Sequence, residues 1–237
     1  LENRVWRLAN GDEFPIISGK QISAGFIYTN NGWTVDIDNY YKTLDHITAL
    51  SLGFLNPENS NFNMGEQNIY GIDLFLRKRF NGFNTWLSYS FNNSKSKYDT
   101  LNDDNYFRST SNVRHAFLTS LSYKISDFQV ALGWRWQTGK PYTESTVGDD
   151  GLEFNNGINT KRLPDYHRLD FSSTYKFKFS KDSKLRAKVG LSIRNVYNKT
   201  NFISREYRGN NDFDNDIETI DKFSIGFTPN MMFRLYW

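Results

Sequence analysis

The side chains best placed for metal chemistry are three carboxylates at alternate positions, Asp212, Asp214 and Asp216. Carboxylate oxygens are preferred ligands of Ca²⁺. The glycine and the distal glutamate of a hand-type calcium loop are missing around them, however. We therefore treat this group as a weak candidate metal site and favour a solvated acidic loop tip.

Residues for catalysis are absent or scattered. The chain has no cysteine, which excludes disulfides, thiolate zinc sites and cysteine nucleophiles. His46, His115 and His167 lie far apart and lack metal-ligand spacing. No Gly-x-Ser-x-Gly elbow accompanies an acid and a histidine. We expect no catalytic residue, no cofactor and no enzyme activity.

Ligand recognition is better served by aromatic rings and guanidinium groups that gather in polar segments. Guanidinium groups pair with carboxylates and stack on rings, a combination that suits a carboxylate-rich or aromatic ligand. For any single residue, packing within a loop or contact with water is the simpler interpretation. The ligand-contacting candidates are Tyr106, Arg108, Tyr142, Arg162, Arg205, Tyr207 and Arg208.

Composition limits the class of protein. The 237 residues include 29 Lys or Arg and 26 Asp or Glu, so the net charge of +3 is too balanced for a nucleic-acid partner. Aromatic residues make up 17% of the chain, which argues against disorder. No apolar run approaches the roughly 18 residues of a membrane-spanning helix. The length allows one all-β domain, and no break in composition divides it.

Apolar and polar residues alternate along nine runs of the chain. In the run from His167 to Phe179, for example, Leu169 and Phe171 share one parity while Arg168 shares the other with lysines. This period of two predicts strands with one apolar and one polar face. The sequence therefore predicts an antiparallel, all-β protein of about nine strands.

The connections between these runs alternate between short and long. Asn-Gly steps, the strongest short signal of a hairpin, occur in two of the short ones. In an up-and-down meander this alternation gathers the short turns at one end and the long loops at the other, as in outer-membrane barrels. The short turns lie near 29–32, 81–84, 126–127 and 180–184, and the long loops near 45–66, 98–112, 139–166 and 203–219.

The pattern alone does not say which face meets water. In a membrane barrel the apolar parity faces lipid, whereas in a soluble barrel it faces inward. Runs of about 11 to 14 residues are long enough to cross the roughly 25 Å apolar band of an outer membrane. Aromatic residues at run ends, such as Trp33 and Trp134, resemble interfacial girdles. We favour the membrane barrel, with a soluble β-rich binding or adhesion domain and a passive porin-like channel as alternatives.

Several stretches, in their order along the chain, carry a resemblance to a known family. They are Val-Trp-Arg-Leu at 5–8, Trp-Gln-Thr-Gly-Lys-Pro-Tyr at 136–142, Leu-Pro-Asp-Tyr-His-Arg-Leu-Asp at 163–170, Asn-Val-Tyr-Asn at 195–198, and Thr-Pro-Asn at 228–230 before a terminal Trp237. With these stretches the chain resembles the C-terminal barrel segment of Gram-negative TonB-dependent outer-membrane receptors.

The resemblance implies a role in the cell outer membrane. Residues 1–237 would be the C-terminal portion of a 22-stranded barrel whose earlier strands and plug domain are absent from this chain. The chain would supply barrel wall and extracellular loops for active uptake of a scarce nutrient such as a ferric siderophore.

The resemblance also implies partners. These are outer-membrane lipid, the remaining strands and plug, a small nutrient ligand, the TonB system acting through the missing N-terminal part, and the barrel-assembly machinery. The terminal Phe233, Leu235 and Trp237 resemble the signal that this machinery reads.

Overall fold

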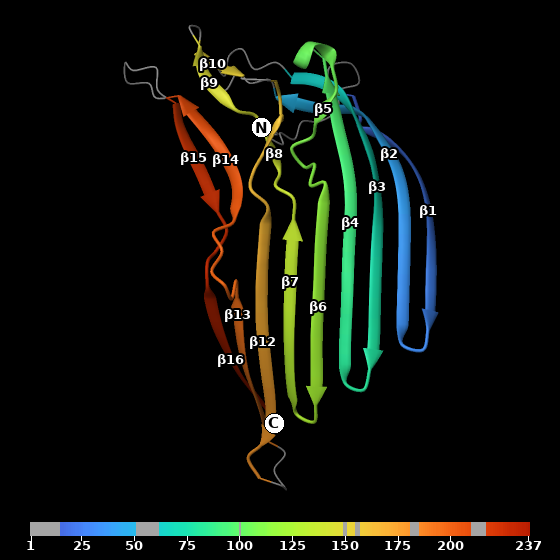
Figure 1. The fold of residues 1–237 in the computed structure, drawn as a ribbon, viewed down its shortest axis with the longest axis vertical. Helices are drawn as coiled ribbons and strands as arrows, with labels where there is room; N and C mark the ends of the chain where they lie inside the picture. Colours follow the sequence, from blue (N-terminus) through green and yellow to red (C-terminus); the bar gives the residue numbers. More distant parts are fainter. Residues whose placement is uncertain are drawn as a thin grey trace.

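A computed structural model of the chain describes residues 15–50, 62–99, 101–148, 151–154, 157–180, 185–209 and 217–237. Within these residues, nine long strands form one antiparallel sheet in which each strand pairs with the next along the chain (Figure 1). They are β1 (Ser18–Asn30), β2 (Trp33–Leu50), β3 (Phe62–Phe80), β4 (Phe83–Tyr98), β6 (His115–Ile125), β7 (Phe128–Gln137), β12 (Tyr166–Lys178), β13 (Arg186–Arg194) and β16 (Thr228–Tyr236). The expected nine-strand meander is confirmed.

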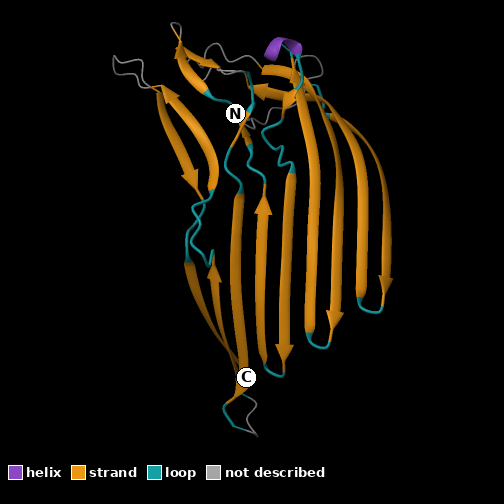
Figure 2. Ribbon diagram, in the orientation of Figure 1, coloured by secondary structure: helices purple, strands orange, loops and turns teal. Residues whose placement is uncertain are grey.

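The remaining elements belong to the long connections. They lie at the end of the sheet opposite the short turns, as Figures 1 and 2 show. The described part contains no helix long and apolar enough to span a membrane. These elements are η3 (Asn102–Asp104), β5 (Phe107–Arg108), which pairs with β4, and three two-stranded sheets, β8 (Pro141–Tyr142) with β11 (Lys161–Arg162), β9 (Ser145–Gly148) with β10 (Gly151–Phe154), and β14 (Phe202–Gly209) with β15 (Ile217–Phe223).

The Asn-Gly turns have the backbone that the sequence predicts. Asn31 and Gly32 have φ values of 51° and 75°, and Asn81 and Gly82 have 41° and 82°. Positive φ at both central residues is typical of the tight turns that match strand twist. A Cβ on Gly32 would also come within 2.5 Å of the Arg79 carbonyl oxygen. These turns fix the register of β1 with β2 and of β3 with β4.

The register aligns the apolar parity of neighbouring strands on one face. Phe26 lies opposite Ile37, Ile37 opposite Leu74, and Leu74 opposite Tyr89. From Tyr89 this rung continues through Phe117 to Trp136, while Leu132 and Phe171 lie opposite each other on the same face, nearer the short turns. Because Phe26 is 61% exposed and Leu132 is 42% exposed, this apolar face is open rather than packed.

No apolar core underlies the sheet in the part of the chain that the structure describes. Hydrophobic side chains are buried there at Tyr98, Leu163 and Ala187 only. A soluble barrel would bury Tyr175 and Leu191 in its interior, yet Tyr175 is 49% and Leu191 is 38% exposed. Phe171 and Trp134, which the same alternative would bury, are only partly covered. The side-chain directions therefore fit a sheet whose apolar face meets hydrocarbon.

Candidate functional site at the long-loop end

The ligand-contacting candidates all lie in the long connections, but the structure divides them into three groups. Tyr142 of β8 approaches Arg205 of β14, and Tyr207 on the same strand interacts with both. We call these three residues, with Asp221 of β15, the outer cluster. Arg108 and Arg162 form a second group, and Tyr106 lies apart beside β3. The backbone of Arg208 lies in β14, whereas its side chain falls outside the described part.

The outer cluster is built on the β14–β15 hairpin. Arg205 lies directly opposite Asp221 in the register of the two strands. Its guanidinium donates from Nε to Asp221 Oδ1 at 2.7 Å and from a terminal nitrogen to Oδ2 at 2.8 Å, a bidentate pair. The same guanidinium lies 5.5 Å from the centre of the Tyr142 ring, within cation–π range.

This geometry sets the charges of the outer cluster. The hydrogen bond from Arg205 lowers the pKa of Asp221 below its usual value, and the same bond raises the pKa of Arg205. Burial raises the pKa of Tyr207, followed by the effect of Tyr142. Arg205 and Asp221 are therefore charged at neutral pH, whereas Tyr207 is a neutral phenol that can donate or accept a hydrogen bond.

Arg162 uses its guanidinium to hold the loop base together. One terminal nitrogen donates to the carbonyl oxygens of Asn112 at 2.9 Å and Gly139 at 2.8 Å, and the other donates to Asn112 Oδ1 at 2.8 Å. Burial lowers the pKa of Arg162, and repulsion from Arg108 acts in the same direction. This arginine is thus a partly desolvated bridge between two connections rather than a free cation.

Arg108 joins the same two connections. Its terminal nitrogen donates to the Thr160 carbonyl oxygen at 3.0 Å, while its own carbonyl accepts from Asn159 Nδ2 at 2.7 Å. Asn159 is 3% exposed and also receives its position from Thr143, whose hydroxyl accepts from the Asn159 N–H at 3.0 Å. For Arg108 and Arg162 this geometry favours the loop-packing interpretation over direct ligand contact.

Tyr106 forms its own small group with β3. Its hydroxyl donates to Glu66 Oε1 at 2.5 Å and accepts from Asn68 Nδ2 at 2.9 Å. The hydrogen bond with Glu66 raises the pKa of Tyr106. The ring remains 41% exposed, so it offers an apolar surface while its hydroxyl is occupied.

The described residues hold no group of three or more histidine, cysteine or acidic side chains that could bind a metal ion. Asp212, Asp214 and Asp216 lie outside the described residues. His115 and His167 each place Nδ1 2.9 Å from a tyrosine hydroxyl, that of Tyr89 and Tyr197 respectively. These two histidines therefore have separate polar partners.

Comparison with known proteins fixes the family. A sequence profile described as "TonB dependent receptor-like, beta-barrel" matches residues 10–198, well over half of the chain. The chain belongs to the TonB-dependent receptor family. No curated protein sequence matches it significantly.

Solved structures share the fold of this TonB-dependent receptor chain. The FrpB iron transporter from Neisseria meningitidis (F3-3 variant) superposes with a TM-score of 0.61 at 17% identity, covering 96% of this chain and 32% of that one. A chain of the FpvAI-pyocin S2 complex gives a TM-score of 0.60 at 15% identity, covering 93% of this chain and 27% of that one. This chain thus spans about a third or less of the length of those structures.

Two of the stretches that resemble TonB-dependent receptors pack against each other at the loop base. A Cβ on Gly139 would clash with the Leu163 carbonyl oxygen, so only glycine allows this approach. The Gly139 N–H donates to Asp165 Oδ1 at 3.2 Å, and Leu163 is 5% exposed. These stretches fix the start and the end of the 139–166 connection.

The Asn-Val-Tyr-Asn stretch of this receptor chain forms a corner after β13. Asn195 Nδ2 donates to the carbonyl oxygens of Lys199 at 2.9 Å and Ile225 at 3.2 Å, and Asn195 Oδ1 accepts from the Lys199 N–H at 3.0 Å. Nearby, Asn201 accepts from the His167 N–H at 3.0 Å and donates to the His167 carbonyl at 2.9 Å. Both asparagines are essentially fully buried.

Sequence reasoning missed these buried asparagines and Asn112. An asparagine in a polar stretch ordinarily indicates a turn or a solvated loop, so composition carried no signal for burial. For Asn195, the available clue was its place within a stretch shared with TonB-dependent receptors. The predicted assembly-signal residues Phe233, Leu235 and Trp237 lie at the end of the chain and are 60%, 40% and 94% exposed, and their role stays a prediction.

Proposed function

We propose that this chain is the C-terminal part of the barrel of a TonB-dependent receptor in the outer membrane of a Gram-negative bacterium. It supplies wall, lumen lining and extracellular loops for active uptake of a scarce nutrient such as a ferric siderophore. In this proposal the earlier strands and a plug domain belong to the rest of the protein. The chain contributes structure and recognition, and no catalytic step is assigned to it.

The observation that carries the proposal is the open apolar face of the sheet. Apolar surface gains about 25 cal/mol per Å² when it leaves water, so a broad apolar face without a covering layer favours hydrocarbon around it. Ile22, Phe26 and Met231 are 72%, 61% and 84% exposed. Their exposure on one parity is the side-chain arrangement expected of an outer-membrane wall.

The two edges of the sheet support the idea that further strands complete it. β1 and β16 end the strand order, and in the described residues neither has a partner on its outer side. Unpaired backbone groups are too costly to leave in the hydrocarbon layer, where no water can satisfy them. A closed barrel that includes additional strands removes both edges.

Nutrient recognition is proposed for the outer cluster. Tyr142 and Tyr207 offer rings and phenols, and Arg205 keeps a cationic face beside Tyr142 although Asp221 occupies two of its donors. Such a combination suits an aromatic, anionic chelate. The FrpB structure is named as an iron transporter, which makes ferric chelates the first ligands to test.

The test uses the full-length protein in cells. Iron-starved cells that carry only this receptor should accumulate radio-iron from its ferric siderophore, and a proton uncoupler should stop the accumulation. Accumulation that continues with the uncoupler would indicate a passive channel instead. The membrane assignment has a separate test, since a purified chain that stays monomeric in water without detergent would contradict it.

A further inference from the structure

Five cations crowd one face of the sheet at the short-turn end of β12, β13 and β16. The register places Lys176 opposite Lys188 and Lys188 opposite Arg234, and on the next rung it places Lys178 opposite Arg186. All five share the polar parity, as their alternation with apolar residues shows. We call this set of five residues the cationic ladder.

The cations of the cationic ladder lie opposite one another in the sheet, which is electrostatically unfavourable. Side chains directly opposite on one face have Cβ atoms about 4.5 to 5.5 Å apart, and like charges there are destabilising. None of the five cations forms an ion pair with a carboxylate of the described residues. The ion pairs found in the described residues lie in β12 near its long-loop end or in the loops. Four of the five are exposed and Lys188 is half-buried.

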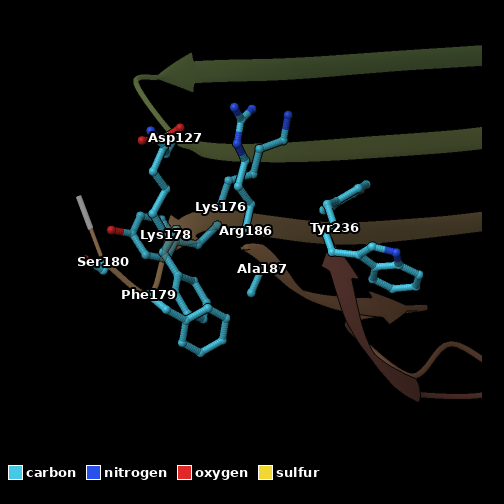
Figure 3. Close-up of a pocket in the computed structure, with 11 residues that line it drawn as sticks. Asp127, Lys176, Lys178, Phe179, Ser180, Arg186, Ala187 and Tyr236 are labelled. Atoms are coloured by element: carbon cyan, nitrogen blue, oxygen red, sulfur yellow. The ribbon is translucent and has the colours of Figure 1, made fainter. Parts of the chain in front are cut away.

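A hollow of about 1230 Å³ lies beside the ladder at the turn end of the sheet, and residues of both parities line it. Lys176, Lys178 and Arg186 line it, and Asp127 is the acidic residue in its lining. Figure 3 shows Arg186 extending toward the side of Asp127, with Phe179 on the other side of the strands. Within the described residues the ladder therefore has positive charge without an ion pair, and open space lies beside three of its cations.

We propose that an acidic polypeptide segment docks along the cationic ladder. Alternate residues of a strand are about 6.6 Å apart, so carboxylates at alternate positions of an extended segment match the two rungs. Lipid headgroups are the weaker candidate because the ladder lies on the face opposite the apolar one. The inference rests on the lipid-facing assignment in the proposed function, but not on the nutrient.

The experiment is carbodiimide cross-linking of the full-length protein in isolated outer membranes. This reagent joins a lysine amine to a carboxylate that touches it, and mass spectrometry identifies both residues. We expect Lys176, Lys178 or Lys188 to be linked to acidic residues of one contiguous segment outside the ladder. We also expect these lysines to be acetylated more slowly than exposed Lys95, because a docked segment covers their amines.

Three results would overturn the proposal. The ladder lysines could be acetylated as fast as Lys95 and form no cross-links, which would show an unoccupied surface. They could be protected without any carboxylate cross-link, which would indicate a phosphate-bearing ligand. The cross-links could join the ladder lysines to Asp127 only, which would show a local contact within the sheet.

A charge-reversal variant and a matched control separate this inference from barrel assembly. The double variant Lys176→Glu with Lys188→Glu should abolish the cross-links at Lys178. Arg79→Glu lies on the same face at the turn end of β3, opposite Asn84, and should leave them unchanged. Detergent extraction and heat-modified gel migration should be normal for both variants, because the ladder is not on the lipid-facing side. Unchanged cross-links at Lys178 in the double variant would also refute the docking proposal.

Discussion

The wall of the sheet and the base of the long loops bury opposite kinds of residue. Along the wall, large apolar side chains such as Phe26 and Leu132 are open, whereas at the loop base Asn112, Asn195 and Asn201 are fully enclosed. The difference indicates different surroundings. A wall in hydrocarbon gains from apolar exposure, while loops that rise into water without an apolar core depend on enclosed hydrogen bonds.

The largest effect is expected when a charge is placed on the apolar face of the wall. Leu132→Arg places a charge on the apolar face of β7, where Leu132 is 42% exposed. A charged residue at the middle of the lipid-facing side costs about 2 to 4 kcal/mol. We expect the free energy of unfolding in lipid vesicles to fall by that amount, measured by urea titration.

The neighbouring Ala131 provides the control for that variant. It lies on the opposite, polar face of β7, so Ala131→Lys should change the free energy of unfolding far less than Leu132→Arg does. Equal losses in the two variants would mean that the two faces meet the same solvent. That result would remove the physical basis for the membrane assignment.

The second prediction removes an enclosed hydrogen-bond donor from the base of the long loops. Arg162→Ala leaves the carbonyl oxygens of Asn112 and Gly139 without the donor that each has now. An enclosed polar group that loses its partner costs about 1 to 3 kcal/mol. Amide hydrogen exchange should accelerate in the 139–166 connection while β6 and β7 stay protected.

Lys161 is the matched control for Arg162. It is next in the chain, and its nearest ion pair, to Glu144, is long at 3.6 Å and exposed. Lys161→Ala should therefore leave exchange in the connection nearly unchanged, as is usual for surface ion pairs. Arg162→Lys should rescue only in part, because one ammonium group cannot reproduce the planar fork of a guanidinium.

How much of each region could be predicted depends on how far apart in the sequence its interacting residues lie. The wall depends on a period of two and on local Asn-Gly turns, which are legible in short windows such as 28–37. The candidate site depends on contacts between connections, for instance Arg205 with Tyr142, that no local pattern encodes. Residue type could nominate both side chains, but only the packing of β14 beside β8 brings them together.

The roles of the arginines show the same limit. From the sequence, Arg162 and Arg205 are equivalent loop cations. In the structure Arg162 is committed to backbone carbonyls, whereas Arg205 pairs with Asp221 and faces a ring. The distinction arises from burial, which depends on tertiary packing.

A third prediction concerns pH and the outer cluster. The folded-state pKa of Asp221 lies below its unfolded value, so its pairing with Arg205 contributes stability above the unfolded pKa of about 4 and loses it as pH falls further. We expect the β14–β15 hairpin to loosen below about pH 4 and to be insensitive to pH between about 5 and 8.

The absence of cysteine from the chain makes this measurement direct. Glu218→Cys on β15 gives a single attachment point for a nitroxide label within this chain, whose mobility is followed by electron paramagnetic resonance. Adding Asp221→Asn should remove the acid-dependent step and leave the label more mobile at neutral pH. A step that persists in the Asp221→Asn background would assign it to another group.

The smallest effect on stability is expected at the end of the wall, where Trp237 is 94% exposed. Because so little of this side chain is enclosed by the rest of the chain, Trp237→Ala should change the free energy of unfolding far less than Leu132→Arg does. If Trp237 is read during assembly, the same variant should slow insertion into the membrane, measured by pulse labelling and gel migration. Tyr236→Ala, on the opposite face of β16, is the control and should insert at the normal rate. Equal rates for both variants would place Trp237 with the rest of the lipid-facing wall, contributing apolar surface and nothing more.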